Sequence, residues 1–456
     1  MILVLAITAI ALGIFYAILQ LDIPGAWKFM AVVIEMVLVS QIFIRKYKLP
    51  SELGMVLVKS KKGIEVIEGL AKKEKAFNFF ADVGAGISYG LLSLVLMRKN
   101  SSAVTLLLGL VILFFLTVFV APVSLAFVMN VAKIGGVEKS AAVLGGSAEA
   151  ALAITGGLLL VGGLFLFILF GIVAYGGIVL SAIFKTLFMG MDTISQTSAG
   201  GTFLLPGVNL PLFEGIIALA IVLIVHEGAH AVLTRIAKVP LLSSGIVLFG
   251  IIPVGAFVEP DEKKLARVER TRQTRVLVAG PSANMVVSAA IFILFMAFFI
   301  GTAQFREEGY LVLAGMEPGT VIHAINGEPV NLTTNPNNFS SFGLPKNGAV
   351  NLLTNKGEII QNTDENGGIE GIIFTVLKKN SLFAVYNVPL LGFIYTTLGL
   401  ALALNFLVGA VNILPIPLFD GYRIIDVNVK NKLLVKTISY GALFFFILNF
   451  LPLLFR

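Results

Sequence analysis

The sequence predicts an α-helical polytopic membrane protein of about nine spans, with a membrane-associated β-hairpin and a small β-rich extramembrane domain. Three observations lead to this fold class. Hydrophobic residues make up 57% of the 456 residues, charged residues only 13%, and the mean hydropathy is +0.96. Apolar runs long enough to cross a bilayer recur along the chain. One polar stretch, at residues 304–381, interrupts them. This composition excludes an ordinary soluble protein.

The apolar runs are the predicted spans. The first run has neither a basic start nor a cleavage site of small residues, so we expect an uncleaved span rather than a signal peptide. The Gly-rich run at residues 150–187 fits either one tilted helix or a kinked one. The predicted spans lie at residues 2–19, 27–44, 77–97, 104–128, 150–187, 213–235, 276–300, within 382–419 and at 435–454.

Basic residues gather in connections between the spans, at residues 45–75, 263–275 and 423–436. By the positive-inside rule these connections are cytoplasmic, and the polar stretch then lies outside. Arg98 and Lys99, in a short connection expected outside, are the exception. The net charge of +7 is therefore attributed to membrane topology, and no nucleic-acid partner is expected. The absence of cysteine excludes disulfides and thiolate metal sites.

A zinc-binding motif lies near the C-terminal end of the span at residues 213–235. His226, Glu227 and His230 form the H-E-x-x-H pattern and include two of the chain's three histidines. Both imidazoles lie on one helical face and can bind one Zn²⁺ per chain, while Glu227 is the expected general base. A chance match or a buried polar cluster without metal would be the alternative. Ionisable groups are costly inside a bilayer helix and usually mark a functional site, which favours zinc.

A catalytic zinc site takes three protein ligands, so one ligand is still missing from the motif. The third histidine, His323, lies in the polar stretch away from the membrane, and a carboxylate is therefore expected. Asp420 is the candidate, because it ends an apolar span on the side where the topology also puts the motif. Pro415 and Pro417 break the helix there, which lets the carboxylate turn inward. A helix cap or an interfacial charge are the alternative roles for Asp420.

Two apolar stretches beside the motif do not have a helical pattern. Residues 202–211 are broken by proline and glycine, and residues 241–260 hold two β-branched runs separated by such residues, which predicts a hairpin. Non-helical backbone at membrane depth must be buried in protein or line a wet cavity, and an ordinary surface loop is the alternative. An edge strand of the hairpin could hold an unwound substrate by strand addition. Val247 and Ile251 are accordingly candidate substrate-binding residues.

The polar stretch at residues 304–381 is long enough for a small soluble domain. Residues 313–331 read LAGMEPGTVIHAINGEPVN, with tight turns expected at Pro-Gly (318–319) and Asn-Gly (326–327) between strands. This pattern is similar to the AGxxPGxxIxxINGxxV stretch of a PDZ-like domain. His323 lies inside it without an acidic or histidine partner at ligand spacing, so no special role is expected for this residue.

From about residue 200 to its C-terminus, the sequence resembles the site-2 protease family of intramembrane zinc metalloproteases (peptidase family M50). It is most similar to the archaeal, PDZ-containing branch of that family. HExxH alone is shared by many proteases, but its combination with an NxxPxPxxDG pattern between spans is specific. The resemblance rests on PGVNLP (206–211), HEGAH (226–230), GAFVEPDE (255–262), AGPSAN (279–284) and NILPIPLFDG (412–421).

The resemblance implies roles for further residues. Asp420 is implied as the third zinc ligand, Asn412 as a catalytic polar group near the scissile carbonyl, and Asn284 as a residue close to the site on the neighbouring helix. The implied activity is hydrolysis of peptide bonds within or near transmembrane segments, in regulated intramembrane proteolysis. The implied partners are transmembrane protein substrates and the lipid bilayer. The implied location is the cell membrane, with the active site toward the cytoplasm and the PDZ-like domain outside as a substrate filter.

The chain then divides into four parts: N-terminal helices with a basic cytoplasmic loop (1–200), the first part of a catalytic core (201–303), the PDZ-like domain (304–381) and the second part of the core (382–456). Two other functions fit parts of the pattern. A transporter would suit many spans with broken helices, but no inverted repeat is visible and the polar groups concentrate at one site. A substrate-holding relative without activity would lack the motif glutamate, and Glu227 is present.

Overall fold

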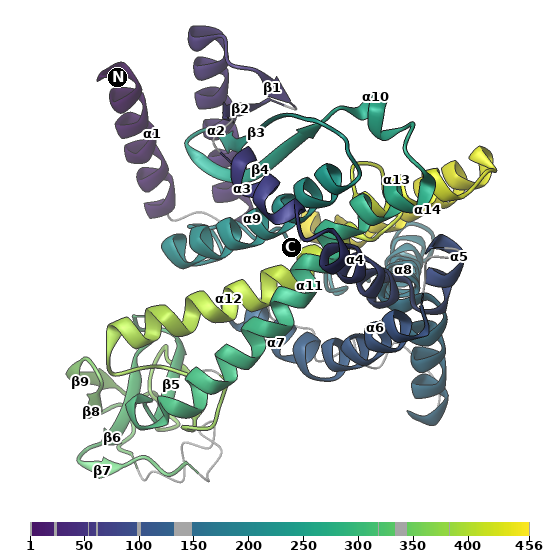
Figure 1. The fold of residues 1–456 in the computed structure, drawn as a ribbon. Helices are drawn as coiled ribbons and strands as arrows, with labels where there is room; N and C mark the ends of the chain where they lie inside the picture. The colour runs from purple at the N-terminus through teal and green to yellow at the C-terminus, as the bar shows by residue number, and fades with distance from the viewer. Residues whose placement is uncertain are drawn as a thin grey trace. The chain divides into compact units, whose positions relative to one another are not determined.

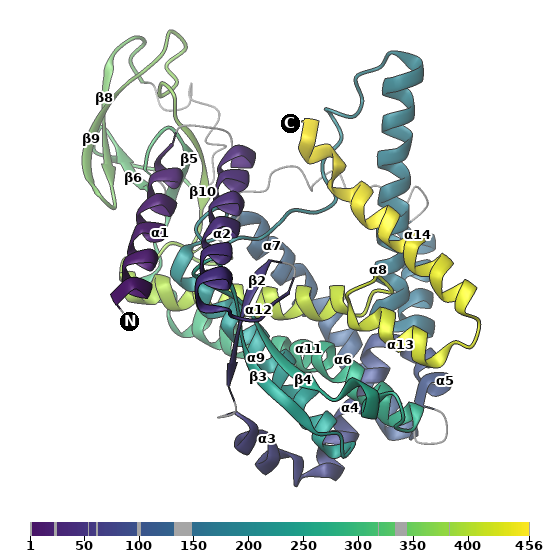
Figure 2. The ribbon, with the colours of Figure 1, turned by 90° about the horizontal axis from the view of Figure 1, so that it is seen from above.

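The computed structural model describes residues 2–21, 25–52, 54–60, 63–97, 102–131, 148–317, 319–332, 344–382 and 384–455. It divides into two compact units. The first comprises Met1–Phe292 and Gly399–Arg456, and the second comprises Ile293–Leu398. Figures 1 and 2 label their helices and strands.

The first unit is mainly helical (Figure 1). Apolar runs form helices because a helix satisfies its backbone hydrogen bonds within its own segment. The α-helices of the described residues are α1 (Ile2–Gln20), α2 (Gly25–Tyr47), α3 (Ile64–Ala71), α4 (Glu74–Tyr89), α5 (Ser93–Met97), α6 (Ala103–Phe115), α7 (Ala121–Val131), α8 (Ala148–Met189), α9 (Leu212–Ile236), α10 (Glu262–Leu265), α11 (Arg270–Gly301), α12 (Pro389–Asn412), α13 (Asp420–Asn428) and α14 (Lys432–Phe450).

Within the described residues, seven helical segments are long and apolar enough to cross a membrane. They are Glu74–Met97, Ala103–Val131, Leu152–Met189, Leu212–Ile236, Arg270–Gly301, Pro389–Asn412 and Lys432–Phe455. The two further predicted spans, residues 2–19 and 27–44, are helical as α1 and α2 but are not among the seven; the apolar stretch of α1 is the shorter Leu3–Ile18. A mainly helical integral membrane protein is thus confirmed, and the count of nine spans stays a prediction.

Two glycines interrupt helical segments at the place where those segments cross. α8 departs from helical geometry at Gly163 (φ 58°), and the segment that begins with α4 departs at Gly90 (φ 52°). A Cβ atom on Gly90 would lie 2.7 Å from the backbone nitrogen of Gly163, which is closer than side chains allow. Glycine is required at both positions by conformation and by space. Of the two alternatives for residues 150–187, the kinked helix is therefore right.

The hairpin predicted at residues 241–260 is confirmed, and it belongs to a larger sheet than expected. β3 (Leu241–Phe249) pairs antiparallel with β4 (Ile252–Pro260) on one side and with β2 (Met55–Ser60) on the other. The strand order is β1-β2-β3-β4, where β1 is Ser51–Glu52. Figures 1 and 2 show the hairpin with β2 along its β3 side. The basic connection predicted only as a loop thus supplies two strands and α3.

The strand-edge role predicted for Val247 and Ile251 is wrong. Val247 lies in an inner strand, paired with Leu57 on one side and with Gly255 on the other, so its backbone offers no open edge. Ile251 lies in the turn between β3 and β4 and packs against apolar side chains of α1 and α2. The preceding residue, Gly250, donates its backbone N–H to Ser40 Oγ of α2 at 2.8 Å, which holds the turn in place. Among the described strands, β4 forms the open edge of the sheet at this hairpin.

Ion pairs fix the N-terminal elements to the rest of the first unit. They are Lys59–Glu259, Glu68–Arg235 and Asp82–Arg275. Asp82 of α4 and Arg275 of α11 pair through two hydrogen bonds of 2.7 Å, and their side chains are only 8% and 15% exposed. Beside them, a Cβ on Gly84 would lie 1.9 Å from Oγ of Ser282, so α4 and α11 are in close backbone approach. α4 is therefore a fixed neighbour of α11.

The second unit carries an antiparallel sheet of order β10-β5-β6-β8-β9, with β7 paired to β6. Its strands are β5 (Gly309–Ala314), β6 (Val321–Ile325), β7 (Glu328–Pro329), β8 (Ala349–Thr354), β9 (Gly357–Asn362) and β10 (Ile373–Leu377). Tyr310, Ile322, Leu352 and Phe374 are buried in one apolar cluster at the core of this sheet. The predicted β-rich domain at residues 304–381 lies within this unit, and its PDZ-like identity stays a prediction.

The Asn-Gly turn predicted in this domain is confirmed. Asn326 and Gly327 have φ of 51° and 83° and join β6 to β7, as a tight turn with two left-handed residues requires. In the predicted Pro-Gly turn, Gly319 has φ 78°, while Pro318 lies outside the described residues. His323 has an acidic partner that its spacing did not reveal, because its Nε2 lies 3.3 Å from Oε2 of Glu307.

Candidate metal centre

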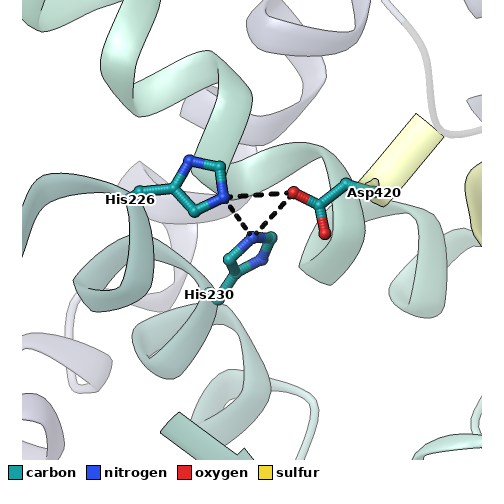
Figure 3. Close-up of side chains that lie close together, drawn as sticks. All are labelled: His226, His230 and Asp420. Atoms are coloured by element: carbon teal, nitrogen blue, oxygen red, sulfur yellow. Dashed lines mark hydrogen bonds and ion pairs between the residues drawn. The ribbon is translucent and has the colours of Figure 1, made fainter. Parts of the chain in front are cut away.

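Three side chains from distant parts of the chain converge on one point (Figure 3). His226 and His230 come from α9, and Asp420 is the first residue of α13. Nε2 of His226 lies 3.1 Å from Oδ2 of Asp420, Nε2 of His230 lies 3.2 Å from the same oxygen, and the two nitrogens are 3.2 Å apart. In the part of the chain that the structure describes, this is the one group of three potential metal ligands from His, Cys, Asp and Glu.

α9 places the two imidazoles by its regular geometry. It begins directly after Pro211 and continues unbroken to Ile236, so residues four apart lie one turn above each other on one face. The rings of His226 and His230 meet edge to face, with centroids 4.8 Å apart and an interplanar angle of 74°. Both Nε2 atoms can therefore point at one ion without distortion of the helix.

Asp420 reaches the imidazoles because the chain turns sharply between α12 and α13. Leu418, in this turn, has φ 85°, and the next helix starts two residues later. A Cβ on Gly421 would lie 2.0 Å from the carbonyl oxygen of Ile413, so glycine is needed for α13 to begin against the end of α12. The N-cap of α13 is Phe419, without a side-chain cap. Asp420 thus does not cap the helix, and its carboxylate is free to face the histidines.

The carboxylate of Asp420 is mostly buried, with its side chain 16% exposed. Burial alone would raise the pKa of Asp420, but the adjacent imidazoles of His230 and His226 hold it well below its usual range. The group is therefore ionised, which is the form that binds a cation.

The spacing of the three ligand atoms fits a metal ion. A tetrahedral zinc with bonds of about 2.0–2.1 Å has ligand atoms roughly 3.3 Å apart. The observed separations of 3.1–3.2 Å are close to this value. Two imidazole nitrogens and one carboxylate oxygen form a donor set that zinc prefers, and three ligands leave a fourth position for substrate.

Contacts behind the imidazoles fix which nitrogen faces the site. Nδ1 of His230 donates to the carbonyl oxygen of Val276 at 2.7 Å, which leaves the lone pair on Nε2 for a metal. Nδ1 of His226 lies 3.0 Å from the side-chain amide of Asn284. A metal on Nε2 puts the proton on Nδ1, and the partner must then accept. Oδ1 of Asn284 is buried and has no hydrogen-bond partner among the described residues, so the amide rotated to present Oδ1 satisfies both groups.

Gly280 of α11 leaves the space in which the ligands meet. A Cβ on this residue would lie 2.3 Å from Nε2 of His230 and 2.7 Å from Nε2 of His226. Any side chain would therefore displace the imidazoles or occupy the position of the ion. The following residue, Pro281, lies inside α11. Gly280 belongs to the AGPSAN stretch, which thus has a steric role at the site.

Glu227 lies beside the three ligands without being one of them. The backbone of Val258 in β4 lies close to its carboxylate. Glu227 and Asn412 both line a cavity of about 300 Å³ that also contains the ligand side chains. A carboxylate next to an ion site, inside a cavity, can act as a proton acceptor for a water molecule there.

The structure thus brings most of the predicted site residues together. His226, Glu227, His230, Asn412 and Asp420 line one cavity. Asn284 lies behind it and contacts His226. Val247 and Ile251 do not line this cavity, as their places in the inner strand and in the turn explain.

Three contributors were missed by the sequence analysis. Gly280 lies in a quoted motif, and a glycine next to a proline in a helix was the signal that could have identified it. Val276 contributes its backbone carbonyl and Val258 a part of the cavity wall, and no sequence pattern marks either role.

Two histidines and a glutamate on one helix long enough to span a membrane, with a distant aspartate at the same point, form the side-chain pattern of a membrane metallopeptidase site. Residues 214–453 match the family model of peptidase family M50, which is more than half of the chain. The chain therefore belongs to peptidase family M50, whose members are intramembrane zinc metalloproteases. This membership favours neither the transporter nor the inactive relative.

A relative from Methanocaldococcus jannaschii, described only as an uncharacterized protein, is 28% identical over 237 residues. The similarity covers 51% of this chain and 61% of the relative. The matched region thus spans less than two thirds of that protein, and its description assigns no substrate.

Proposed function

We propose that this protein is a zinc-dependent intramembrane endopeptidase that hydrolyses peptide bonds within or near transmembrane segments of other membrane proteins. The observation that carries the proposal is the group of His226, His230 and Asp420 at ligand spacing, with Glu227 beside it. The group lies among helices long and apolar enough to cross a membrane. Metal-assisted hydrolysis is the reaction class that suits these residues.

In this proposal His226, His230 and Asp420 hold one zinc per chain. When bound, zinc supplies Lewis acidity that activates water and polarises a carbonyl group. Glu227 accepts the proton of the attacking water, and Val258 of β4 lies beside it in the cavity wall. Asn412, which lines the same cavity, donates a hydrogen bond to the oxygen of the scissile carbonyl as negative charge develops there.

Strand addition to β4 offers a way to hold the substrate extended. β4 is the outer strand of its sheet and Val258 in it lines the metal cavity, so this edge of β4 faces the site. A substrate segment paired along that edge would present its backbone next to the general base. A helical substrate must unwind first, because its own hydrogen bonds protect its carbonyl groups. Of the two strands of the hairpin, β4 rather than β3 is thus the one that would bind substrate.

The basic connections support an assignment of the side of the membrane on which the site lies. Residues 45–75, 263–275 and 423–436 are rich in Lys and Arg, which supports a cytoplasmic active site. The β-rich domain of the second unit would then be extracytoplasmic. We assign to it the PDZ-like role of a filter against substrates with large ectodomains, in regulated intramembrane proteolysis of the archaeal PDZ-containing type.

The test is cleavage of a single-span membrane protein by the purified enzyme in lipid vesicles, with the products mapped by mass spectrometry. We expect one or a few cuts within or near the span, loss of cleavage with a zinc chelator, and recovery when zinc is added back. His323→Ala, which changes the histidine outside the site, is the control and should cleave like the parent. Cleavage that persists after complete zinc removal would contradict the proposal.

A further inference from the structure

A second cavity, about 850 Å³ in volume, lies in the first unit next to the metal cavity. One wall is formed by α9 and by β3 and β4, and the facing wall by α3 and the start of α4. α3 packs against both α9 and β3. The volume falls within the range of about 300–1,000 Å³ that is typical of ligand sites. This space, which we call the apolar cavity, is large enough for several side chains.

The apolar cavity and the metal cavity share two wall residues. Glu227 and Val258 line both, so the expected general base and the exposed edge of β4 stand between them. A group that entered the apolar cavity would therefore lie directly beside the reacting bond. Gly228, the next residue of α9, lines the apolar cavity and has open space where a Cβ would be.

The chemistry of the apolar cavity is that of hydrocarbon. Glu227 is its one charged lining residue among the described parts of the chain. The facing wall presents Val66, Ile67 and Leu70 from α3, with Phe77 and Phe80 from α4. Burial against such a surface releases the most free energy for large aliphatic or aromatic groups, whereas polar groups would lose their hydration without finding a hydrogen-bond partner.

The facing wall is held in place by contacts outside the cavity. Glu68 of α3 pairs with Arg235 of α9 at 2.9 Å, and Asp82 of α4 pairs with Arg275 of α11. α3 and α4 are thus each joined to the core helices α9 and α11, and α3 also packs on β3. A packed wall can discriminate between groups of different size, because an oversized group would have to displace it.

We propose that the apolar cavity receives large apolar side chains of the substrate next to its scissile bond, and that α3 and α4 thereby set substrate specificity. The inference rests on the proposed peptidase function. A peptide is favoured over a lipid chain as the occupant because the edge of β4, which lies in the cavity wall at Phe257 and Val258, offers backbone hydrogen-bonding groups. A lipid tail would leave those groups unpaired, whereas an extended peptide satisfies them and places alternate side chains in one direction.

The test compares single-span substrates that carry Ala, Leu or Phe at each residue flanking the cleavage site. The parent enzyme should cleave the best Leu or Phe substrate at least 10-fold faster than its Ala counterpart, as expected for apolar pockets. Val66→Trp fills the cavity from its exposed rim and should reduce cleavage of the Leu and Phe substrates roughly 10-fold, while the Ala substrate changes little. Phe80→Ala enlarges the cavity and should shift preference from Leu toward Phe.

Phe79→Ala is the matched control, because Phe79 lies on the same helix, is 44% exposed and does not line the cavity. It should keep the selectivity of the parent. Zinc content should equal that of the parent in every variant, since none of these residues contacts a ligand. Cleavage with the same selectivity in all variants would overturn the specificity role and leave the peptidase standing.

A second measurement keeps the inference testable if no substrate is cleaved, an outcome that would count against the peptidase function itself. Val66 is replaced by the photo-crosslinker p-benzoylphenylalanine in the Glu227→Gln background. The protein is then irradiated in vesicles of phosphatidylethanolamine and phosphatidylglycerol that contain the Leu substrate. A crosslink to the flanking residues of the peptide supports the inference. Crosslinks to phospholipid alone, or to neither, overturn it.

Discussion

The metal cavity and the apolar cavity share Glu227 and Val258, yet different parts of the chain build them. All three candidate ligands of the metal cavity lie within residues 214–453, the segment that matches the peptidase family. The facing wall of the apolar cavity comes from α3 and α4, which precede that segment. The smaller cavity holds the polar groups and the larger one the apolar surface. Reaction chemistry and choice of substrate can therefore change separately in such a molecule.

The largest expected effect is at the ligands themselves. Asp420→Ala removes one of three ligands, and His226→Ala removes another, so each should lose bound zinc and with it all hydrolysis. Zinc per chain, measured by mass spectrometry of the purified protein, checks this. Val66→Trp, on the apolar side, should keep a full complement of zinc. Full zinc content in Asp420→Ala would remove the aspartate from the ligand set.

A smaller effect should separate the base from the ligands. Glu227→Gln keeps the shape of the side chain but cannot accept a proton, so hydrolysis should fall by roughly 10²–10⁴-fold while zinc is retained. Because glutamine preserves the size of this side chain, which also lines the apolar cavity, binding of the substrate should remain close to that of the parent. Turnover at the parent rate in this variant would mean that another group activates the water.

The steric role of Gly280 predicts a partial loss. Gly280→Ala puts a methyl group against both Nε2 atoms, and zinc affinity should fall at least roughly 10-fold, as when a neighbour of a metal ligand is disturbed. Gly301→Ala, in open space at the end of the same helix, is the control and should bind zinc like the parent. Zinc affinities from competition with a chelator compare the two. Equal values would show that the site has room for a Cβ.

The smallest effect on hydrolysis is expected at the ion pair between α4, which lines the apolar cavity, and α11, which borders the metal cavity. Asp82→Ala leaves the guanidinium of Arg275 buried and unpaired, which should lower the free energy of unfolding by about 3–5 kcal/mol. Replacement of both residues by Leu should restore much of this loss, since no unpaired charge remains. The zinc stoichiometry of the folded protein should not change.

Asp426→Ala is the comparison for this pair. It removes an exposed ion pair with Lys432 and should cost about 0–1 kcal/mol. Thermal unfolding in detergent measures all these variants. A similar stability of Asp82→Ala and Asp426→Ala would mean that α4 is not anchored through Asp82.

The sequence was sufficient to predict those structural features that depend on local residue patterns. Apolar runs predicted the spans, four-residue spacing predicted the two histidines on one face, and β-branched runs predicted the hairpin. Asp420 could be predicted because its position at the end of a span follows from topology. These features depend on neighbours in sequence or on which side of the membrane a residue lies.

Pairing between strands that lie far apart in the chain could not be predicted from the sequence. The run MVLVKS, which forms β2, alternates as a strand does, but it lies in a lysine-rich connection whose charge predicts only a cytoplasmic loop. A hairpin without β2 is open at β3, which is why Val247 was predicted as an edge residue although it lies in an inner strand. An edge strand is one that lacks a partner strand on one side. The partner of β3 on that side is β2, which lies almost 200 residues earlier in the chain, and a local sequence pattern cannot reveal such a distant pairing.

His226 and His230 are held by different kinds of partner, and the difference determines how mutation can affect each imidazole. His226 depends on the side chain of Asn284, so a single codon change can remove its support. His230 depends on the carbonyl oxygen of Val276, which every amino acid supplies. Mutation at position 276 can change the size of the side chain there but cannot delete that acceptor. Random substitution can therefore disturb the orientation of His226 much more readily than that of His230.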